Sequence, residues 1–152
     1  WSEARSLDWW LLDQPSHAQL RQFVSSLNRI YRAHSALWAR DSDAGAFTRL
    51  GAPKWNPNVI AFGRRDWHGN HVVVAANFSG APLTPFELDL PEAGVWHEIL
   101  NTDAQEYGGS GVGNLGMVHA DENRRATLTL PPLGVLWLRH DPQAHIPSPT
   151  RG

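Results

Sequence analysis

The stretch LNTDAQEYGGSGVGNLG, residues 100–116, holds five of the 13 glycines in this chain and contains a formal G-x-G-x-x-G at residues 111–116. In a dinucleotide-binding fold, this motif joins a strand to a helix within a βαβ unit. A strand-like run, Val95–Leu100, does precede the stretch, but residues 117–123 show no helical spacing of apolar side chains. The sequence therefore predicts a long, irregular loop in a β-domain rather than a nucleotide site, with glycines allowing backbone conformations closed to other residues.

Short runs with strand-like composition flank this loop on both sides. From Phe47 onward, runs rich in branched and aromatic residues alternate with turns that contain Gly, Pro, Asn and Asp. Such a pattern is typical of an antiparallel β-sandwich or barrel, and the turn DWHGN at residues 66–70 fits a hairpin. We expect an antiparallel β-sandwich with seven strands: Phe47–Leu50, Val59–Arg64, His71–Asn77, Phe86–Leu90, Val95–Leu100, Thr127–Leu130 and Val135–Arg139.

One long amphipathic helix is predicted ahead of the strands, over Ser16–His34. Ser16 and Gln19 have the spacing of a capping box, directly after Pro15. Apolar side chains then recur at helical spacing, at Leu20, Phe23, Val24, Leu27, Ile30 and Tyr31. Because a one-sided apolar stripe needs a cover, the helix must pack against the β-domain or against structure outside this sequence.

The composition excludes several classes of function. A chain of 152 residues with 41% apolar content suits one domain, or a small domain with an appendage. The net charge of -2 and the lack of a basic run argue against a nucleic-acid partner. With no cysteine, disulfides and thiolate-bound zinc are excluded. No apolar run approaches the ~20 residues that span a bilayer, and no signal peptide opens the chain, so we expect a cytoplasmic protein with no membrane partner. The start at Trp1 rather than Met suggests a piece of a longer protein.

Residue spacing alone reveals no set of catalytic residues. The eight histidines form no H-E-x-x-H pair, and no G-x-S-x-G is present, so neither a metal nor a cofactor is expected. Asp103 and Glu106, in the glycine-rich stretch, are candidate acids, although loop carboxylates are usually only hydrated. Carboxylate pairs for glycosidic chemistry meet only in the fold, so spacing cannot reveal them.

Eight tryptophans are unusual for this length. Trp fills cores, but it also stacks on the flat apolar faces of sugar rings. At the N-terminus Asp8 adjoins Trp9 and Trp10, which suits a carbohydrate-contacting rim in which Asp accepts hydroxyl hydrogen bonds while Trp stacks. Composition alone favours the alternative, in which this segment packs its Trp and Leu side chains against neighbouring structure.

Six segments, in this order, carry a family resemblance: SLDW (6–9), LNRIYR (27–32), VVVAANFS (72–79), WHEILNTD (96–103), YGGSGVGNLG (107–116) and TLPPLGVLWL (129–138). Together they closely resemble the C-terminal end of bacterial glycogen branching enzymes, the 1,4-alpha-glucan branching enzymes of the alpha-amylase superfamily. The resemblance is collinear over residues 1–140. The NTD…YGGSGxGN and TLPPL runs are specific to that family.

The resemblance implies a domain organisation. In that family a (β/α)8 barrel carries catalysis and an all-β domain follows it. Residues 1–40 would be the end of the barrel, with its last loop and last helix, and residues 41–140 the C-terminal all-β domain. Residues 141–152 would be a disordered tail. The apolar stripe of the helix would then cover a barrel that lies outside this sequence.

The resemblance also implies a chemistry, namely retaining transglycosylation that moves an α-1,4 glucan chain to a 6-hydroxyl. The Asp nucleophile, the Glu acid and the second Asp of that family have no counterparts here, so no catalytic residue is expected and the piece should be inactive alone. Asp8 and Trp9 match the SLDW segment near the open face of the barrel, where such sites lie, and this implies glucan contact. The implied partners are α-glucan and the catalytic barrel of the parent chain.

Two other functions remain compatible with the sequence. The eight tryptophans and the sandwich pattern suit a free-standing α-glucan-binding module. A purely structural cap for the barrel is the other, and it predicts that the isolated piece exposes the stripe around Phe23, Val24 and Leu27.

Overall fold

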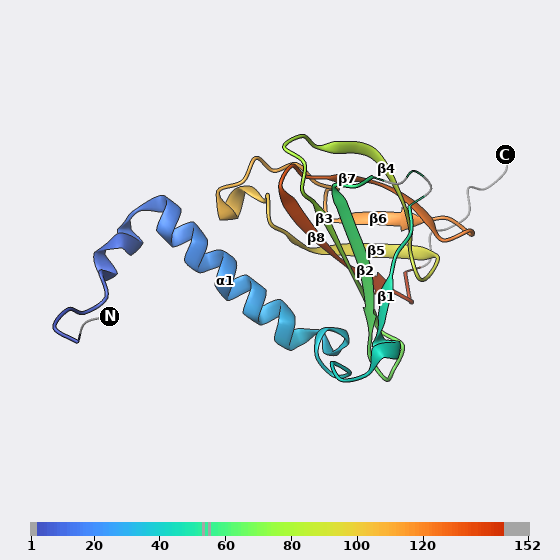
Figure 1. Ribbon diagram of the computed structural model, residues 1–152, viewed down its shortest axis with the longest axis horizontal. Coiled ribbons are helices and arrows are strands. Elements are labelled where there is room, and N and C mark those ends of the chain that lie inside the picture. Colours follow the sequence, from blue (N-terminus) through green and yellow to red (C-terminus); the bar gives the residue numbers. More distant parts are fainter. Residues whose placement is uncertain (1–2, 53, 55, 145–152) are drawn as a thin grey trace.

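The computed structural model describes residues 3–52, 54 and 56–144, so the tail from 145 onward and Trp1 and Trp55 lie outside the described residues. One long helix leads into a curled β-sheet (Figure 1). The elements in chain order are η1 (Trp9–Asp13), α1 (Pro15–Ala33), η2 (Ser35–Leu37), η3 (Ala44–Ala46), β1 (Phe47–Arg49), β2 (Val59–Arg65), β3 (His71–Asn77), β4 (Leu83–Asp89), β5 (Gly94–Asn101), η4 (Gln105–Tyr107), β6 (Met117–Ala120), β7 (Arg125–Leu130) and β8 (Gly134–Asp141).

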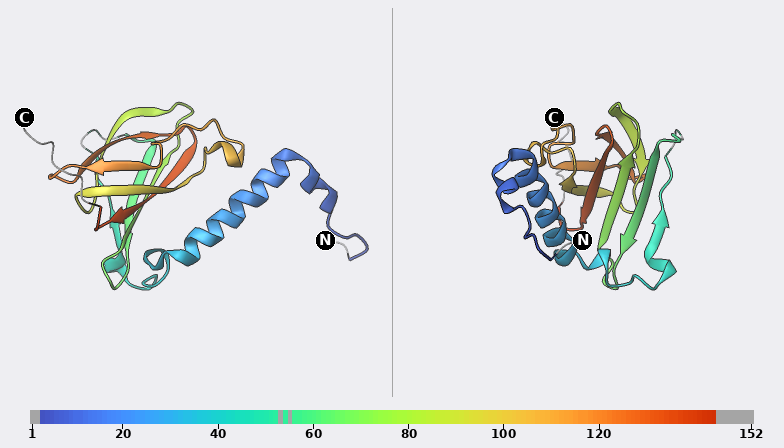
Figure 2. Two further views of the ribbon diagram at one scale, coloured as in Figure 1. Left: turned by 180° about the vertical axis from the view of Figure 1, so that it is seen from behind. Right: turned by 60° about the vertical axis from the view of Figure 1, so that its left-hand side comes forward.

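Eight strands form one antiparallel sheet in the order β1-β2-β3-β8-β5-β6-β7-β4. The sheet curls so that its two halves face each other across the main core (Figure 2). Trp96 on β5 is fully buried there, among Leu88, Leu130, Leu136 and Leu138. The mainly-β sandwich prediction is confirmed, and all seven predicted strands are present.

The eighth strand, β6, is absent from the sequence prediction. It has four residues, MVHA, and pairs with β5 from His97↔Met117 to Gly94↔Ala120. Val118 and Ala120 point into the core while Met117 and His119 are exposed. A run this short carries too little alternation to be recognised without its partner strand.

The helix prediction is confirmed over nearly its full length, but the capping box is wrong. Gln14 is the N-cap, Pro15 occupies the first helical position, and no side chain makes a capping hydrogen bond. Proline suits that position because its missing N–H would have no partner inside the helix and its φ is already helical. Ser16 therefore lies inside the first turn, two residues past the N-cap position.

One side of α1 packs on the β-domain and the adjacent side does not. Ile30 joins Ala36, Leu37, Val72 and Leu100 in a second core, and Phe23 meets Tyr107 edge-on with ring centroids 5.4 Å apart. Leu20, Val24 and Tyr31 remain exposed. Of the three residues expected to be exposed, only Val24 is, because Phe23 and Leu27 pack at the edge of the second core.

The strands differ in what their outer faces show. In β7 burial alternates strictly, with Ala126, Leu128 and Leu130 inside and polar side chains outside. In β3 the apolar run Val72–Ala75 is buried on both faces. An alternating strand has one face in water, whereas a continuous apolar strand is covered on both.

Candidate functional site

The glycine-rich loop is held together by Asp103. Its carboxylate accepts hydrogen bonds from the Ser110 backbone N–H (2.9 Å), the Ser110 hydroxyl (2.5 Å) and the Val112 backbone N–H (3.0 Å). Burial acts to raise the pKa of Asp103, but these hydrogen bonds outweigh it and the net pKa is lowered. Asp103 is therefore an ionised organiser of the loop, with its oxygens engaged, and is poorly suited to donate a proton.

Two glycines in this loop are required by close approaches. A Cβ on Gly109 would lie 2.2 Å from the Asp103 carbonyl oxygen, and one on Gly113 would lie 2.4 Å from the Asn101 Nδ2. Below 3.0 Å something must move, and at Gly109 the obstacle is backbone. The glycines thus fold the loop back on its own start, as the sequence predicted in outline, and they form no phosphate cradle.

The same loop contacts α1. Glu106, the other candidate acid, accepts a hydrogen bond of 3.2 Å from Gln22 Nε2, and Tyr107 meets Phe23. Glu98 and Asn114 anchor the far end, since Asn114 also donates to the Thr129 carbonyl. These contacts make the loop a brace between the helix and the sheet.

Asp8 and Trp9, the predicted glucan-contacting pair, lie at the far end of α1 from the sheet (Figure 1). Asp8 precedes η1, where its carbonyl accepts from the Leu11 N–H at 3.0 Å and its side chain makes no capping bond. Trp9 is 66% exposed, and Trp10 is similarly open. The structure therefore brings a carboxylate and two exposed indoles to one short segment.

The tryptophans divide sharply by burial. Of the six that the structure describes, Trp96 is fully buried and Trp137 is half-buried. Trp9, Trp10, Trp38 and Trp67 are exposed. The Arg40 guanidinium lies 4.2 Å from the Trp67 ring centroid, so a cation already covers part of that indole.

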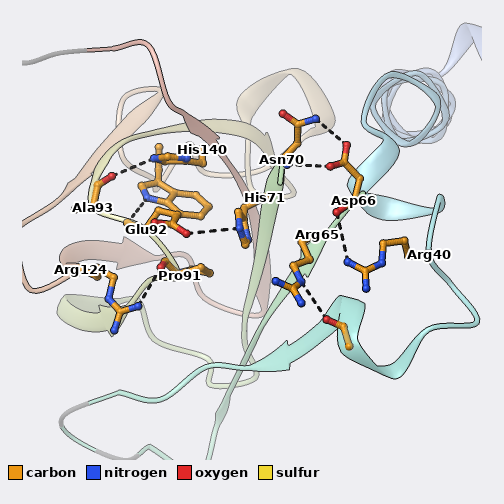
Figure 3. A network of polar contacts seen from close by, with 12 residues as sticks. Arg40, Arg65, Asp66, Asn70, His71, Pro91, Glu92, Ala93, Arg124 and His140 are labelled. Carbon is orange, nitrogen blue, oxygen red and sulfur yellow. Dashed lines mark hydrogen bonds and ion pairs between the residues drawn. The ribbon is translucent and has the colours of Figure 1, made fainter. Parts of the chain in front are cut away.

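Asp66 is a polar centre that sequence reasoning missed. It is 2% exposed, at the start of the β2–β3 turn, and its carboxylate accepts from Ser35 Oγ (2.6 Å), Asn70 Nδ2 (2.7 Å) and the His68 N–H (2.8 Å). Burial acts to raise its pKa, but the hydrogen bonds outweigh it and hold the pKa at about 2. Figure 3 shows Asn70 and Arg40 approaching from two sides. In the sequence, the D-x-x-x-N spacing of residues 66–70 was the one feature that could have pointed to Asp66.

A pocket of about 260 Å³ opens beside Asp66, between the end of α1 and strands β3 and β8. Its lining includes His34, His71, His140 and Arg139. Burial is the main cause that lowers the pKa of His34 and of His71, and a Glu92 carboxylate 3.8 Å from His71 opposes it there. His140 Nε2 lies 3.0 Å from the Ala93 carbonyl (Figure 3). In the part of the chain that the structure describes, no three His, Cys, Asp or Glu side chains are arranged to hold a metal ion.

Residues 53–141 match the family described as the alpha amylase C-terminal all-beta domain. The chain belongs to that family. The match begins ahead of β2 and ends at the last residue of β8, so α1 lies outside it. The curled antiparallel sheet is the all-β domain that the family description names.

Relatives called 1,4-alpha-glucan branching enzyme GlgB extend the similarity through α1. The chain is 51% identical over 145 residues to the protein of Leifsonia xyli subsp. xyli, which covers 91% of this chain and 20% of that relative. It is 44% identical over 144 residues to that of Nocardia farcinica, covering 91% and 19%, and 40% identical over 148 residues to that of Aquifex aeolicus, covering 93% and 24%. The resemblance carried by the six segments is confirmed, and this chain spans about a fifth of the length of those relatives. No helix among the described residues is long and apolar enough to cross a bilayer.

Proposed function

We propose that this chain is the C-terminal part of a cytoplasmic 1,4-alpha-glucan branching enzyme of glycogen biosynthesis. Such an enzyme cuts an α-1,4 glucan and transfers the chain to a 6-hydroxyl, which forms an α-1,6 branch. The observation that carries the proposal is the collinear identity of 40–51% to proteins of that name over nearly the whole chain. Glycogen or amylose-like chains would be the substrate of the complete enzyme.

This piece contributes no reacting group. Its best loop acid, Asp103, has its oxygens engaged by the loop backbone, and Glu106 is bonded to α1. Asp66 is buried and fully hydrogen-bonded. The carboxylates of the retaining reaction therefore belong to the rest of the parent chain, and this piece supports them from outside.

Support for the barrel is its principal role in this proposal. Residues 1–40 would belong to the end of the barrel, residues 41–140 to the C-terminal domain, and 141–152 to a tail. The exposed stripe of Leu20, Val24 and Tyr31 lies on the side of α1 that the β-domain leaves open. Covering apolar surface stabilises by about 25 cal/mol per Å², so the barrel and this stripe would stabilise each other.

Glucan contact by Asp8 and Trp9 is the second element of the proposal. The support is local: an indole that is 66% exposed stands beside a carboxylate without a side-chain capping bond. An exposed indole can stack on a sugar ring, while the Asp8 carboxylate accepts sugar hydroxyl protons in hydrogen bonds.

The test is branching by the full-length parent protein on amylose, followed as the fall in iodine absorbance and the release of short chains by a debranching enzyme. We expect branching by the full-length protein and none by these 152 residues alone. A full-length protein that leaves the iodine spectrum unchanged would refute the proposal.

A non-catalytic α-glucan-binding module is the alternative, and the exposed Trp38 and Trp67 favour it. Affinity electrophoresis in gels containing glycogen separates the two proposals. A binding module retards the full-length protein through Trp38 and Trp67, so their replacement by Ala would restore its mobility. A purely supporting domain leaves mobility unchanged by those substitutions.

A further inference from the structure

The glycine-rich loop is the part of the β-domain that reaches the N-terminal half of α1. Gln22 Nε2 donates a hydrogen bond of 3.2 Å to Glu106, and the rings of Phe23 and Tyr107 meet edge-on with centroids 5.4 Å apart. We call the pair Glu106 and Tyr107 the clasp. The rest of this half of the helix stands away from the sheet (Figures 1 and 2), so the clasp is where the β-domain holds it.

The clasp is carried by a stiff piece of backbone. The Gly109 N–H donates to the Ala104 carbonyl at 3.1 Å, and the Gly111 N–H donates to the Asp103 carbonyl at 2.7 Å. The Asp103 carboxylate accepts two more hydrogen bonds from Ser110. These bonds join the backbone on the two sides of the clasp, so the loop resists bending where the helix rests on it.

A second contact holds α1 near its C-terminal end, where Ile30 packs among Leu37, Val72 and Leu100. At ~1.5 Å of rise per residue, the clasp contact at Phe23 lies about 11 Å from Ile30, and the start of the helix lies about 22 Å from it. With Ile30 as the pivot, a shift of about 1 Å at the clasp becomes a shift of about 2 Å at the start of α1.

The start of α1 is connected to Asp8 and Trp9 by an unbroken series of backbone hydrogen bonds. The Ala18 N–H donates to the Gln14 carbonyl at 3.1 Å, the Gln14 N–H donates to the Leu11 carbonyl at 3.0 Å, and the Leu11 N–H donates to the Asp8 carbonyl at 3.0 Å. Because each bond links one turn to the next, the segment with Asp8 and Trp9 moves with the helix.

We propose that Tyr107 and Glu106 are positioning residues for the glucan contact of Asp8 and Trp9. They act by fixing the direction of α1 and touch no sugar themselves. The inference rests on the proposed function, since the position of Trp9 matters only if Trp9 contacts glucan. A misplacement of about 1 Å can cost up to about 100-fold in rate, so the shift passed along the helix is large enough to weaken glucan binding.

Tyr107 should contribute more to the clasp than Glu106. Its ring packs at the edge of the second core, whereas the hydrogen bond from Gln22 to Glu106 is exposed to water. Water competes for an exposed hydrogen bond, but it does not replace the contact of two aromatic rings. Tyr107 is therefore the residue at which to test the inference.

Steady-state branching of amylose by the full-length parent protein provides the test. Tyr107→Ala removes the ring from the clasp, and Tyr107→Phe keeps it. We expect Tyr107→Ala to raise the KM for amylose about three- to tenfold with kcat changed less than about twofold, because binding is weakened and the chemistry is not. Tyr107→Phe should leave KM unchanged. An unchanged KM in Tyr107→Ala would overturn the inference.

Leu128→Ala separates loss of position from loss of stability. It removes a buried side chain of β7 from the main core, so it should lower thermal stability and leave KM unchanged. If it raised KM as much as Tyr107→Ala does, the effect would be general destabilisation and the inference would fall. Phe23→Leu keeps an apolar side chain at the second core but removes the other ring, so it repeats the measurement in the case where Tyr107→Ala does not fold.

A double-mutant cycle shows whether Tyr107 acts through Trp9. Tyr107→Ala should raise KM much less in a Trp9→Ala background than in the wild type, because the indole that it would misplace is already absent. Fully additive increases would mean that Tyr107 acts by another route, which contradicts the proposal.

Failure here and failure of the proposed function give different results. If Trp9→Ala raises KM and Tyr107→Ala does not, the glucan contact stands and the positioning role is lost. Affinity electrophoresis in gels containing glycogen ranks the same variants without catalysis. A protein whose retardation falls in Tyr107→Ala but which does not branch amylose therefore retains the positioning role and loses the proposed function.

Discussion

Strands β7 and β2 lie in the same sheet, but they differ in what their outer faces meet. The outward residues of β7 are polar, whereas those of β2 begin with Ile60 and Phe62. Their inward residues are alike, since Leu128 and Ala61 both join the main core. The comparison teaches that two strands can share one core and still differ on their outer faces, which are polar along β7 and apolar at the start of β2.

Substitutions on the inner face should destabilise both halves of the sheet to a similar extent, and their effects on stability should be the largest. Leu128→Ala on β7 and Leu138→Ala on β8 each remove a nearly inaccessible side chain from the main core. We expect each to cost about 2–5 kcal/mol of unfolding free energy, from lost transfer energy plus a cavity. Thermal unfolding of the full-length protein measures this. If one of the two variants were as stable as the wild type, the sheet would not share a single core.

Two hairpin turns, one with a buried Asp and one with an exposed Asp, provide the next comparison. In each, an Asp N–H donates to the carbonyl four residues on and its carboxylate accepts from that residue's N–H: Asp66 with Asn70, and Asp121 with Arg125. Asp66 is buried and bonded to Ser35 as well, whereas Asp121 is exposed. Asp66→Asn should therefore cost about 2 kcal/mol, and Asp121→Asn less than about 0.5 kcal/mol.

The pH dependence of stability tests the contribution of Asp66 in a second way. The folded pKa of Asp66 is about 2, below the ordinary value of 3.8. A lowered folded pKa means that the unfolded chain binds the proton more tightly, so this stabilisation, about 2 kcal/mol, is complete above pH 4 and is lost as the pH falls toward 2. The difference between wild type and Asp66→Asn should shrink over that range in denaturant titrations. A difference that stayed constant from pH 5 to pH 2 would argue against an ionised Asp66.

Substitutions on the outer face should separate the two halves directly. Ile60→Ser removes an apolar side chain from the outer face of β2, and Met117→Ser does the same on the outer face of β6. In the full-length protein we expect Ile60→Ser to cost about 1 kcal/mol, because it removes part of the burial of one apolar side chain. Met117→Ser should stay within about 0.5 kcal/mol. A larger loss of stability in Met117→Ser than in Ile60→Ser, measured by calorimetry, would contradict the difference expected between the two outer faces.

The smallest effect on stability is expected at Trp9. Trp9→Ala and its control Trp67→Ala remove indoles that are 66% and 69% exposed, so both should change stability by less than about 0.5 kcal/mol. In steady-state assays of the full-length protein, we expect Trp9→Ala to raise the KM for amylose and Trp67→Ala to leave it unchanged. An unchanged KM in both variants would remove Trp9 from the glucan-binding surface.

Local periodicity predicted the positions of seven strands and of α1, because alternation and 3.6-residue spacing depend only on neighbours along the chain. The same locality explains the errors. The capping box at Ser16 was two residues out of place because Pro15 already occupied the first helical position and Gln14 the N-cap. The strand β6 was missed because its four residues become a strand only beside β5. Asp8 and Trp9 came from a resemblance, and their contact with glucan stays a prediction.

The sequence by itself determined the positions of seven of the eight strands, where the helix lies, and to which family the chain belongs. Tertiary structure alone decided the strand order, the burial of Asp66 under Ser35, and the use of Asp103 to close the glycine-rich loop. It also decided which part of the helical stripe is covered and that the outer face of β2 is not. The physical reason is that these outcomes depend on contacts between residues distant in the chain, such as Ser35 with Asp66, and local pattern carries no record of them.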